Sequence, residues 1–325
     1  MTWMVTGGAG YIGAHVVRAL LAHGMAVVVL DDLSSGHAEF VPDDVPFVRA
    51  SLLDTDSVRD ALATYGVVGV IHLAAFKYAG VSVQRPLHTY NQNVVGTVSL
   101  LEAMADAAVP RIVFSSSAAV YGTPDVPMVT EDTPTAPESP YGESKLIGEW
   151  LLAGQARATA DGPAPLTHTS LRYFNVVGSG SPDLYDSSPH NLFPLVLDAL
   201  AEGRRPQING TDYPTPDGTC VRDYLHVADL AESHVSAARA LADNRPLDPA
   251  YNLGSGEGVS VRQIMTAVAE VTGIDFEPVV AGRRPGDPVR IVASGDRAAR
   301  DLGWRMTHSL ADMVSSAWRA RSALS

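Results

Sequence analysis

The fold is constrained most by six short apolar segments that alternate with helical stretches over residues 1–174. The helical stretches are expected at about residues 11–23, 55–65, 91–108 and 141–158. Such alternation is typical of a parallel sheet covered by helices on both faces. The sequence therefore predicts an α/β fold built on a doubly wound parallel sheet. The predicted strands are TWMVT, AVVVLDD, FVRAS, VVGVIHLAA, RIVFSSS and LTHTSLRYF.

A glycine-rich turn, TGGAGYIG, joins the first predicted strand to the first predicted helix. Gly7, Gly10 and Gly13 are spaced three apart. Glycines here allow a tight turn and let a pyrophosphate approach the backbone amides of a helix N-terminus. The second strand runs into Asp31, 18 residues after Gly13, where a carboxylate would accept both ribose hydroxyls and repel a 2′-phosphate. The pattern predicts a Rossmann sheet that binds NAD in preference to NADP.

The segment SPYGESKL carries a tyrosine and a lysine on one expected helix face. Ser139 suits the N-cap and Pro140 the first helical position, while Tyr141 and Lys145, four residues apart, would point the same way. The chain has 21 arginines but only two lysines, Lys77 and Lys145, so we infer that arginine would not serve at position 145. A neighbouring cation, a helix N-terminus and the positively charged nicotinamide of NAD all favour a phenolate. We therefore expect Tyr141 to act as a base.

Composition and charge argue against several classes of protein, namely nucleic-acid binders, membrane proteins, secreted proteins and metalloproteins. The 325 residues are 46% hydrophobic, enough for one large core or two domains that share a cleft, and the formal charge of −13 argues against a general nucleic-acid binder. One cysteine, Cys220, suits a reducing cytoplasm. No apolar run reaches the roughly 20 residues that span a bilayer, and no signal-peptide pattern opens the chain. His72, His226 and Cys220 lack metal-ligand spacing. We expect a cytoplasmic protein without a membrane partner or a metal.

Several segments resemble those of the UDP-glucose 4-epimerase family, within the extended short-chain dehydrogenase/reductase superfamily. They occur in that family's order from residue 5 to residue 287, and DYPTPDGTCVRDYLHVADLA is the most specific of them. The resemblance implies an NAD enzyme that acts on a UDP-sugar, and a homodimer formed through the helices at 91–108 and 141–158. The segments are TGGAGYIGAH, HLAAFKYAGVSVQRPLHTYNQNVVGT, SSSAAVYG, SPYGESK, LRYFNVVG, DYPTPDGTCVRDYLHVADLA, YNLGSG and RRPGD.

The resemblance also implies roles for single residues. Tyr141 would be the catalytic base, Lys145 its partner, and Ser117 a hydrogen-bond donor to the reacting oxygen. The positions that match cofactor contacts are Gly7, Gly10, Tyr11, Ile12, Gly13, Asp31, Ser51, Leu52, Ala75, Lys77, Asn93, Tyr141, Lys145 and Tyr173. The positions that match substrate contacts are Lys77, Ser117, Tyr141, Asn175, Asn191, Leu192, Asn209, Arg222, Arg284, Asp287 and Ile291.

Three positions depart from the family's pattern. Ser51 replaces an aspartate that recognises adenine in many members, so that contact would come from the backbone of Leu52 or be lost. Asn209 replaces an aromatic residue that often lies against uracil. Ile291 stands where some members have a tyrosine that closes the sugar pocket. Because isoleucine is smaller than tyrosine, we expect room for a 2-N-acetyl group.

The combined reading is a two-domain enzyme that inverts C4 of a UDP-hexose through a transient 4-keto intermediate. We expect residues 1–174 to form an NAD-binding domain, to which residues 223–250 also belong. The rest of residues 175–325 would form a smaller α/β substrate domain. A UDP-uronic acid or UDP-pentose 4-epimerase, and a non-catalytic NAD-binding regulatory or scaffold protein, remain alternatives. A 4,6-dehydratase is disfavoured, because Ala118 and Ala119 follow Ser117 where that chemistry needs an acid–base pair.

Overall fold

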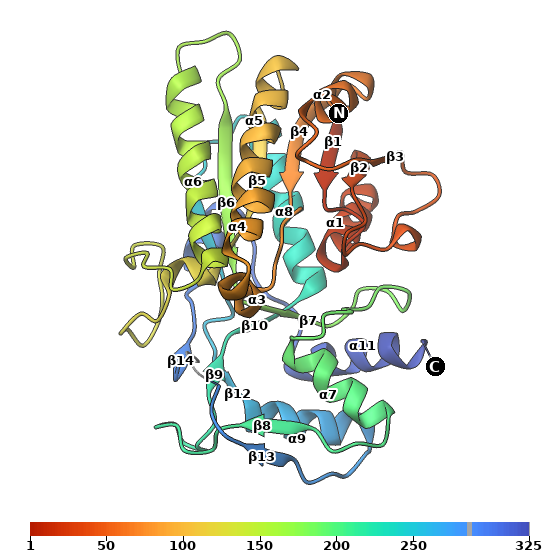
Figure 1. Cartoon of the computed structure of the whole chain (residues 1–325), viewed down its shortest axis with the longest axis vertical. Helices are drawn as coiled ribbons and strands as arrows, with labels where there is room; N and C mark the ends of the chain where they lie inside the picture. Colours follow the sequence, from red (N-terminus) through yellow and green to blue (C-terminus); the bar gives the residue numbers. More distant parts are fainter. Residues whose placement is uncertain (285–287, 325) are drawn as a thin grey trace.

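The computed structural model describes residues 1–284 and 288–324, and a seven-stranded parallel sheet forms its upper part (Figure 1). The strand order β11-β6-β5-β4-β1-β2-β3 reverses direction between β1 and β4, which creates the switch point where ligands bind in such sheets. The predicted Rossmann-type fold is confirmed. The strands are β1 (Thr2–Thr6), β2 (Ala26–Asp31), β3 (Phe47–Arg49), β4 (Val67–His72), β5 (Arg111–Ser117), β6 (Thr167–Tyr173) and β11 (Ala250–Leu253).

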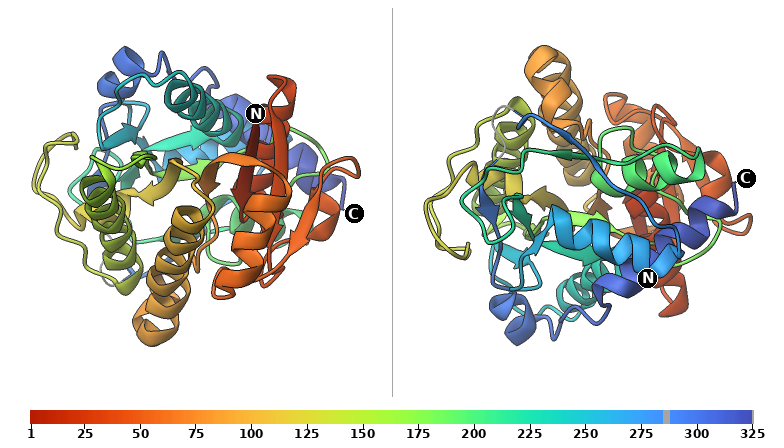
Figure 2. Two further views of the ribbon diagram at one scale, coloured as in Figure 1. Left: turned by 90° about the horizontal axis from the view of Figure 1, so that it is seen from above. Right: turned by 90° about the horizontal axis from the view of Figure 1, so that it is seen from below.

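Helices cover both faces of this sheet (Figure 2). One face packs against α1 (Tyr11–Ala22), α8 (Val227–Ala242) and α10 (Asp296–Asp301). The other face packs against α2 (Thr55–Thr64), α5 (Gly96–Asp106) and α6 (Pro140–Thr159). Burial from both sides explains why the strands are continuous apolar runs rather than alternating ones.

The segment between β4 and α5 is less regular than the sequence suggests. Two short helices, α3 (Ala79–Gln84) and α4 (Pro86–Tyr90), precede a π-helical turn at Asn91–Val95. The single helix expected at 91–108 therefore begins as a π-helical segment and continues as α5. By contrast, α6 starts as predicted: Ser139 accepts a hydrogen bond from the Gly142 amide at 3.2 Å, and Pro140 occupies the first turn.

A second hydrophobic core lies below the first sheet and joins three helices to short strands (Figure 1). Its helices are α7 (Leu192–Ala201), α9 (Val261–Thr272) and α11 (Leu310–Ser322). The short strands pair as β7 (Asn175–Val177) with β10 (Tyr224–His226), β8 (Gln207–Asn209) with β13 (Val279–Ala281), and β9 (Val221–Arg222) with both β12 (Val259–Ser260) and β14 (Arg290–Ile291).

The two cores do not divide the chain where the sequence suggests. The expected boundary assigns residues from 251 onward to the smaller domain, but β11 pairs in parallel with β6 at the edge of the large sheet. Ala298, Leu302 and Trp304 also pack into the core of that sheet. A strand of four residues shows too little periodicity to be predicted, and its place at the sheet edge depends on long-range packing. Among the described residues, no helix is long and apolar enough to cross a membrane.

Candidate active site

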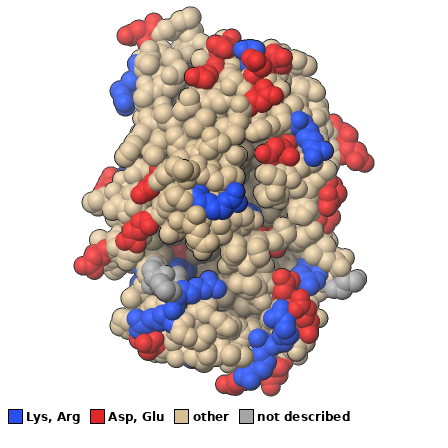
Figure 3. All heavy atoms as spheres, viewed as in Figure 1, with Lys and Arg blue, Asp and Glu red and all other residues tan. Residues whose placement is uncertain are grey.

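A cavity of about 670 Å³ opens at the carboxyl ends of the strands, between the sheet and the second core. Figure 3 shows this face hollowed at mid-height, with a basic side chain at the rim of the hollow. The lining combines residues far apart in the sequence, from Gly7 in the first turn to Arg284 in the second core. The cavity therefore lies where the reversal of strand order predicts a ligand site.

The glycine-rich turn forms one end of the cavity. Gly7 has φ +74°, and a Cβ atom there would lie 2.6 Å from the amide nitrogen of Ala74. A Cβ atom on Gly13 would lie 2.0 Å from the carbonyl oxygen of Gly7. Only glycine fits either place. Gly10 is the N-cap of α1 and makes no side-chain cap, so the first amides of α1 are available to a phosphate.

Asp31 lies at the carboxyl end of β2 beside this turn. Its carboxylate accepts hydrogen bonds from the amides of Ala9 at 3.1 Å and Leu33 at 2.8 Å. Burial raises the pKa of Asp31, and these two backbone bonds partly offset the rise. The carboxylate lines the cavity and is held in a fixed orientation, as a ribose-binding group requires.

Tyr141, Lys145 and Ser117 meet where β5 ends beside α6. The Lys145 ammonium donates to the carbonyl oxygen of Ser115 at 2.8 Å and lies 5.9 Å from the centroid of the Tyr141 ring. A hydrogen bond with Ser117 lowers the pKa of Tyr141 in part. The predicted spacing on one helix therefore becomes a spatial cluster with a hydroxyl from a strand end.

Burial dominates the electrostatics of this cluster. It raises the pKa of Tyr141 despite the Ser117 hydrogen bond, and it lowers the pKa of Lys145 from 10.5 to about 7. Desolvation disfavours both the phenolate and the ammonium. Burial therefore opposes the phenolate that the neighbouring cation, the helix N-terminus and a nicotinamide are expected to favour.

Asn93 lies behind the cavity wall rather than in it. Its side chain accepts a hydrogen bond from the Phe76 amide at 2.7 Å and donates to the Phe76 carbonyl at 3.1 Å. The same amide donates to the Ser144 hydroxyl at 2.9 Å, and Ser144 donates to the Tyr141 carbonyl at 2.7 Å. Asn93 thus ties the loop after β4 to the first turn of α6 and supports Tyr141 indirectly.

The remaining predicted residues divide into two groups. Most of them line the cavity, whereas Ser117 stands at its edge and Ile291 packs on the cluster around Val120, Tyr121 and Leu146. Asp287 lies outside the described residues. The predicted residues that line the cavity are Gly7, Gly10, Tyr11, Ile12, Gly13, Asp31, Ser51, Leu52, Ala75, Lys77, Tyr141, Lys145, Tyr173, Asn175, Asn191, Leu192, Asn209, Arg222 and Arg284.

Asn209 has a definite partner in the structure. With its amide oriented to satisfy both neighbours, its oxygen accepts hydrogen bonds from Arg284 at 3.0 Å from Nε and 3.3 Å from Nη2. Asn209 therefore orients the Arg284 guanidinium, which lines the cavity.

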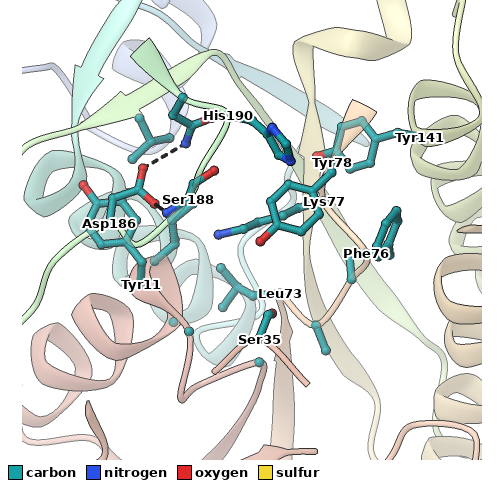
Figure 4. Close-up of a pocket in the computed structure, with 18 of the residues that line it drawn as sticks. Tyr11, Ser35, Leu73, Phe76, Lys77, Tyr78, Tyr141, Asp186, Ser188 and His190 are labelled. Atoms are coloured by element: carbon teal, nitrogen blue, oxygen red, sulfur yellow. Dashed lines mark hydrogen bonds between the residues drawn. The ribbon is translucent and has the colours of Figure 1, made fainter. Parts of the chain in front are cut away.

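Several lining residues were not predicted from the sequence (Figure 4). Phe76 and Tyr78 flank Lys77 on the loop after β4, and the Tyr78 ring meets the His190 ring edge-on at 5.1 Å. Asp186, on the opposite loop, accepts from the Ser188 amide at 3.0 Å and the Asn191 amide group at 2.8 Å. Phe76 and Tyr78 adjoin a predicted site lysine, which was a usable signal. The loop with Asp186 and His190 has no such marker.

Comparison with known proteins identifies the family. Residues 3–254 match the model of the NAD dependent epimerase/dehydratase family. The UDP-glucose 4-epimerase of Streptomyces lividans is 44% identical over 98% of this chain and 96% of its own length. That of Corynebacterium glutamicum is 42% identical over 100% of this chain and 97% of its own length. A crystal structure of UDP-glucose-4-epimerase from Stenotrophomonas maltophila, with bound NAD and formylated UDP-arabinopyranose, is 38% identical with a TM-score of 0.94, covering 100% of this chain and 98% of its own. The chain therefore belongs to the UDP-glucose 4-epimerases of the NAD dependent epimerase/dehydratase family.

Proposed function

We propose that this protein is an NAD-dependent epimerase that inverts C4 of UDP-glucose and UDP-galactose through a transient 4-keto intermediate. The observation that carries the proposal is that Tyr141 and Lys145 line one cavity with a dinucleotide turn, while Ser117 is hydrogen-bonded to Tyr141. The family and the relatives' activity support the same reaction. About 670 Å³ is ample for a reacting sugar beside a nicotinamide.

The residues present fit NAD. Gly7 and Gly13 permit the tight turn that brings the N-terminus of α1 to the cavity, where its first amides would bind a pyrophosphate. The Asp31 carboxylate would accept the ribose hydroxyls and repel a 2′-phosphate. When bound there, NAD would supply the hydride acceptor for C4 of the sugar and a positive charge that favours the Tyr141 phenolate.

Tyr141 and Ser117 would handle the proton. The Tyr141 phenolate would take the proton of the sugar's 4-hydroxyl, and the Ser117 hydroxyl would hold the oxygen that becomes the ketone. The Lys145 amino group is fixed by the Ser115 carbonyl, 5.9 Å from the centroid of the Tyr141 ring. After the 4-keto sugar has rotated to present its other face, Tyr141 would return the proton. The cycle therefore consumes neither a proton nor an external oxidant.

Arginines in the second core would hold the nucleotide part of the substrate away from the reacting carbon. Arg222 and Arg284 both line the cavity, and Arg284 is oriented by Asn209. Guanidinium groups bind a diphosphate through paired hydrogen bonds. Binding at the diphosphate anchors the substrate while leaving the hexose free to present its other face.

The test is NMR of UDP-glucose, UDP-galactose, UDP-GlcNAc and UDP-glucuronate incubated with the protein and no added reductant. We expect axial–equatorial interconversion at C4 of the two hexoses, and none with a Tyr141→Phe variant, whose rate should fall by about 10²- to 10⁴-fold. Turnover of UDP-glucuronate alone would replace the proposed substrate. Near-normal turnover by the Tyr141→Phe variant would remove Tyr141 as the base.

We further propose that the protein is a cytoplasmic homodimer. Large apolar side chains are exposed on packed elements between α3 and α6: Val83 at 62%, Leu87 at 82%, Val95 at 49% and Trp150 at 62% of their surface. Large apolar groups exposed together usually mark an interface. The single, buried Cys220 accords with a reducing compartment.

A further inference from the structure

A buried ion pair lies outside the cavity, next to the catalytic cluster. Arg172 of β6 is 7% exposed and Glu149 of α6 is 9% exposed. The guanidinium donates to both oxygens of the carboxylate, from Nε at 2.9 Å and from Nη2 at 2.5 Å. This two-bond geometry fixes both the distance and the relative orientation of the strand and the helix.

The pair is connected to residues that adjoin the proposed active-site residues. The Ser116 hydroxyl donates to the Glu149 carboxylate at 2.5 Å, and Ser116 is the neighbour of Ser117 on β5. Arg172 is the neighbour of Tyr173, which lines the cavity. Glu149 follows Lys145 by four residues, as Lys145 follows Tyr141, so all three project from one side of α6.

The pair also reaches the edge of the sheet. Arg172 donates from Nη1 to the Tyr121 hydroxyl at 2.8 Å, and Tyr121 donates to the Asn252 side chain at 2.8 Å. The backbone N–H of Asn252 donates to the Glu131 carboxylate at 2.8 Å. The network therefore connects α6, β5, β6 and β11 through hydrogen bonds that leave little freedom for α6 to slide.

Stability alone does not explain such a pair. Taking two charges out of water costs several kcal/mol per ion, and replacing a buried pair with apolar residues of similar size is often neutral or stabilising. Hydrogen bonds to Ser116 and Tyr121 are directional, whereas an apolar contact is not. These bonds therefore allow α6 only one position along the ends of β5 and β6.

We propose that Glu149 and Arg172 are positioning residues that set the distance between Tyr141 on α6 and Ser117 on β5. They act through the helix and through Ser116, without touching the sugar or the cofactor. This inference rests on the proposed function, because Tyr141 and Ser117 are the groups being positioned. Displacement of a reacting group by about 1 Å can cost 10²-fold in rate.

The test compares stability with catalysis in the holoenzyme. Glu149→Gln leaves Arg172 buried without its counter-charge and should lower both. The double variant Glu149→Leu/Arg172→Met should recover a melting temperature near that of the unmodified protein and an unchanged KM, while kcat stays about 10²-fold lower. Recovery of kcat together with stability would refute the proposal.

The control is an ion pair remote from the catalytic cluster, between Asp198 of α7 and Arg321 of α11, joined at 2.5 Å and more exposed than the Glu149–Arg172 pair. Its double variant Asp198→Leu/Arg321→Met should leave kcat unchanged. If the Glu149→Leu/Arg172→Met protein does not fold, the kcat of the Glu149→Asp variant tests the proposal instead. That variant keeps the charge but shortens the side chain by one methylene, so an unchanged kcat would refute the proposal.

A second measurement needs no substrate and separates this inference from the proposed function. The ionisation of Tyr141 is followed near 295 nm with NAD bound, as the difference between each protein and its Tyr141→Phe counterpart. Loss of the Ser117 hydrogen bond should move the midpoint to higher pH in the Glu149→Leu/Arg172→Met variant. An unmoved midpoint would refute the positioning role. Absence of epimerisation by the unmodified protein would refute only the proposed reaction.

Discussion

Replacing Lys145 with methionine should stabilise the protein once its nucleotide has been removed, while abolishing its activity. Lys145 is 4% exposed, and burial lowers its pKa from 10.5 to about 7. At ~1.4 kcal/mol per pKa unit, holding the charged form inside the fold costs about 5 kcal/mol. Methionine fills a similar space without a charge. It loses one hydrogen bond to the Ser115 carbonyl, about 1 kcal/mol, so a gain of about 4 kcal/mol is expected.

The sign of the pH dependence gives a sharper test. The folded pKa of Lys145 lies below the unfolded value, so the folded state binds fewer protons. Its cost to stability is present in full below pH 7 and disappears as the pH rises from about 7 to 10.5. The advantage of Lys145→Met should therefore be largest near pH 6 and shrink towards zero above pH 10.

Urea unfolding of the two proteins at a series of pH values measures this difference, and titrations elsewhere in the chain cancel between them. Lys77→Met is the matched control, because Lys77 is exposed at the cavity rim and its replacement should give no pH-dependent gain. A Lys145→Met protein that is less stable near neutral pH, or whose advantage does not vary with pH, would contradict the account of burial given above.

The remaining predictions concern the cofactor, the sugar and the dimer. Gly13→Ala places a methyl group 2.0 Å from a backbone oxygen of the same turn and should abolish retention of NAD, measured by nucleotide release on denaturation; Gly154→Ala, where a Cβ meets nothing closer than 3.9 Å, should retain it. Ile291 packs on Val120, Tyr121 and Leu146 and is not among the residues that line the cavity, so its expected effect on the sugar needs a direct test. If position 291 limits the sugar pocket, UDP-GlcNAc should be epimerised and Ile291→Tyr should reduce that turnover more than turnover of UDP-glucose; equal losses would refute this role. Trp150→Glu should yield monomers in sedimentation velocity, whereas Val280→Glu, at a similarly exposed valine, should leave the dimer intact.

The sequence was sufficient for features whose physics is local. Three glycines in a turn after an apolar strand, Asp31 at the end of the next strand, and a tyrosine and lysine at helical spacing each limit the backbone or the side chains within a few residues. These patterns predicted the sheet, the cofactor turn and the two members of the catalytic cluster that share α6.

Only the tertiary structure decided features that depend on burial and on distant contacts. Burial sets the pKa of Tyr141 and Lys145 against the expectation drawn from their spacing. The placement of β11 beside β6, the Asn209–Arg284 contact and the Glu149–Arg172 pair join segments separated by 23 to 80 residues. Sequence periodicity carries no information about such pairings, because the directions in which two remote side chains meet are set by the packing of the elements that carry them.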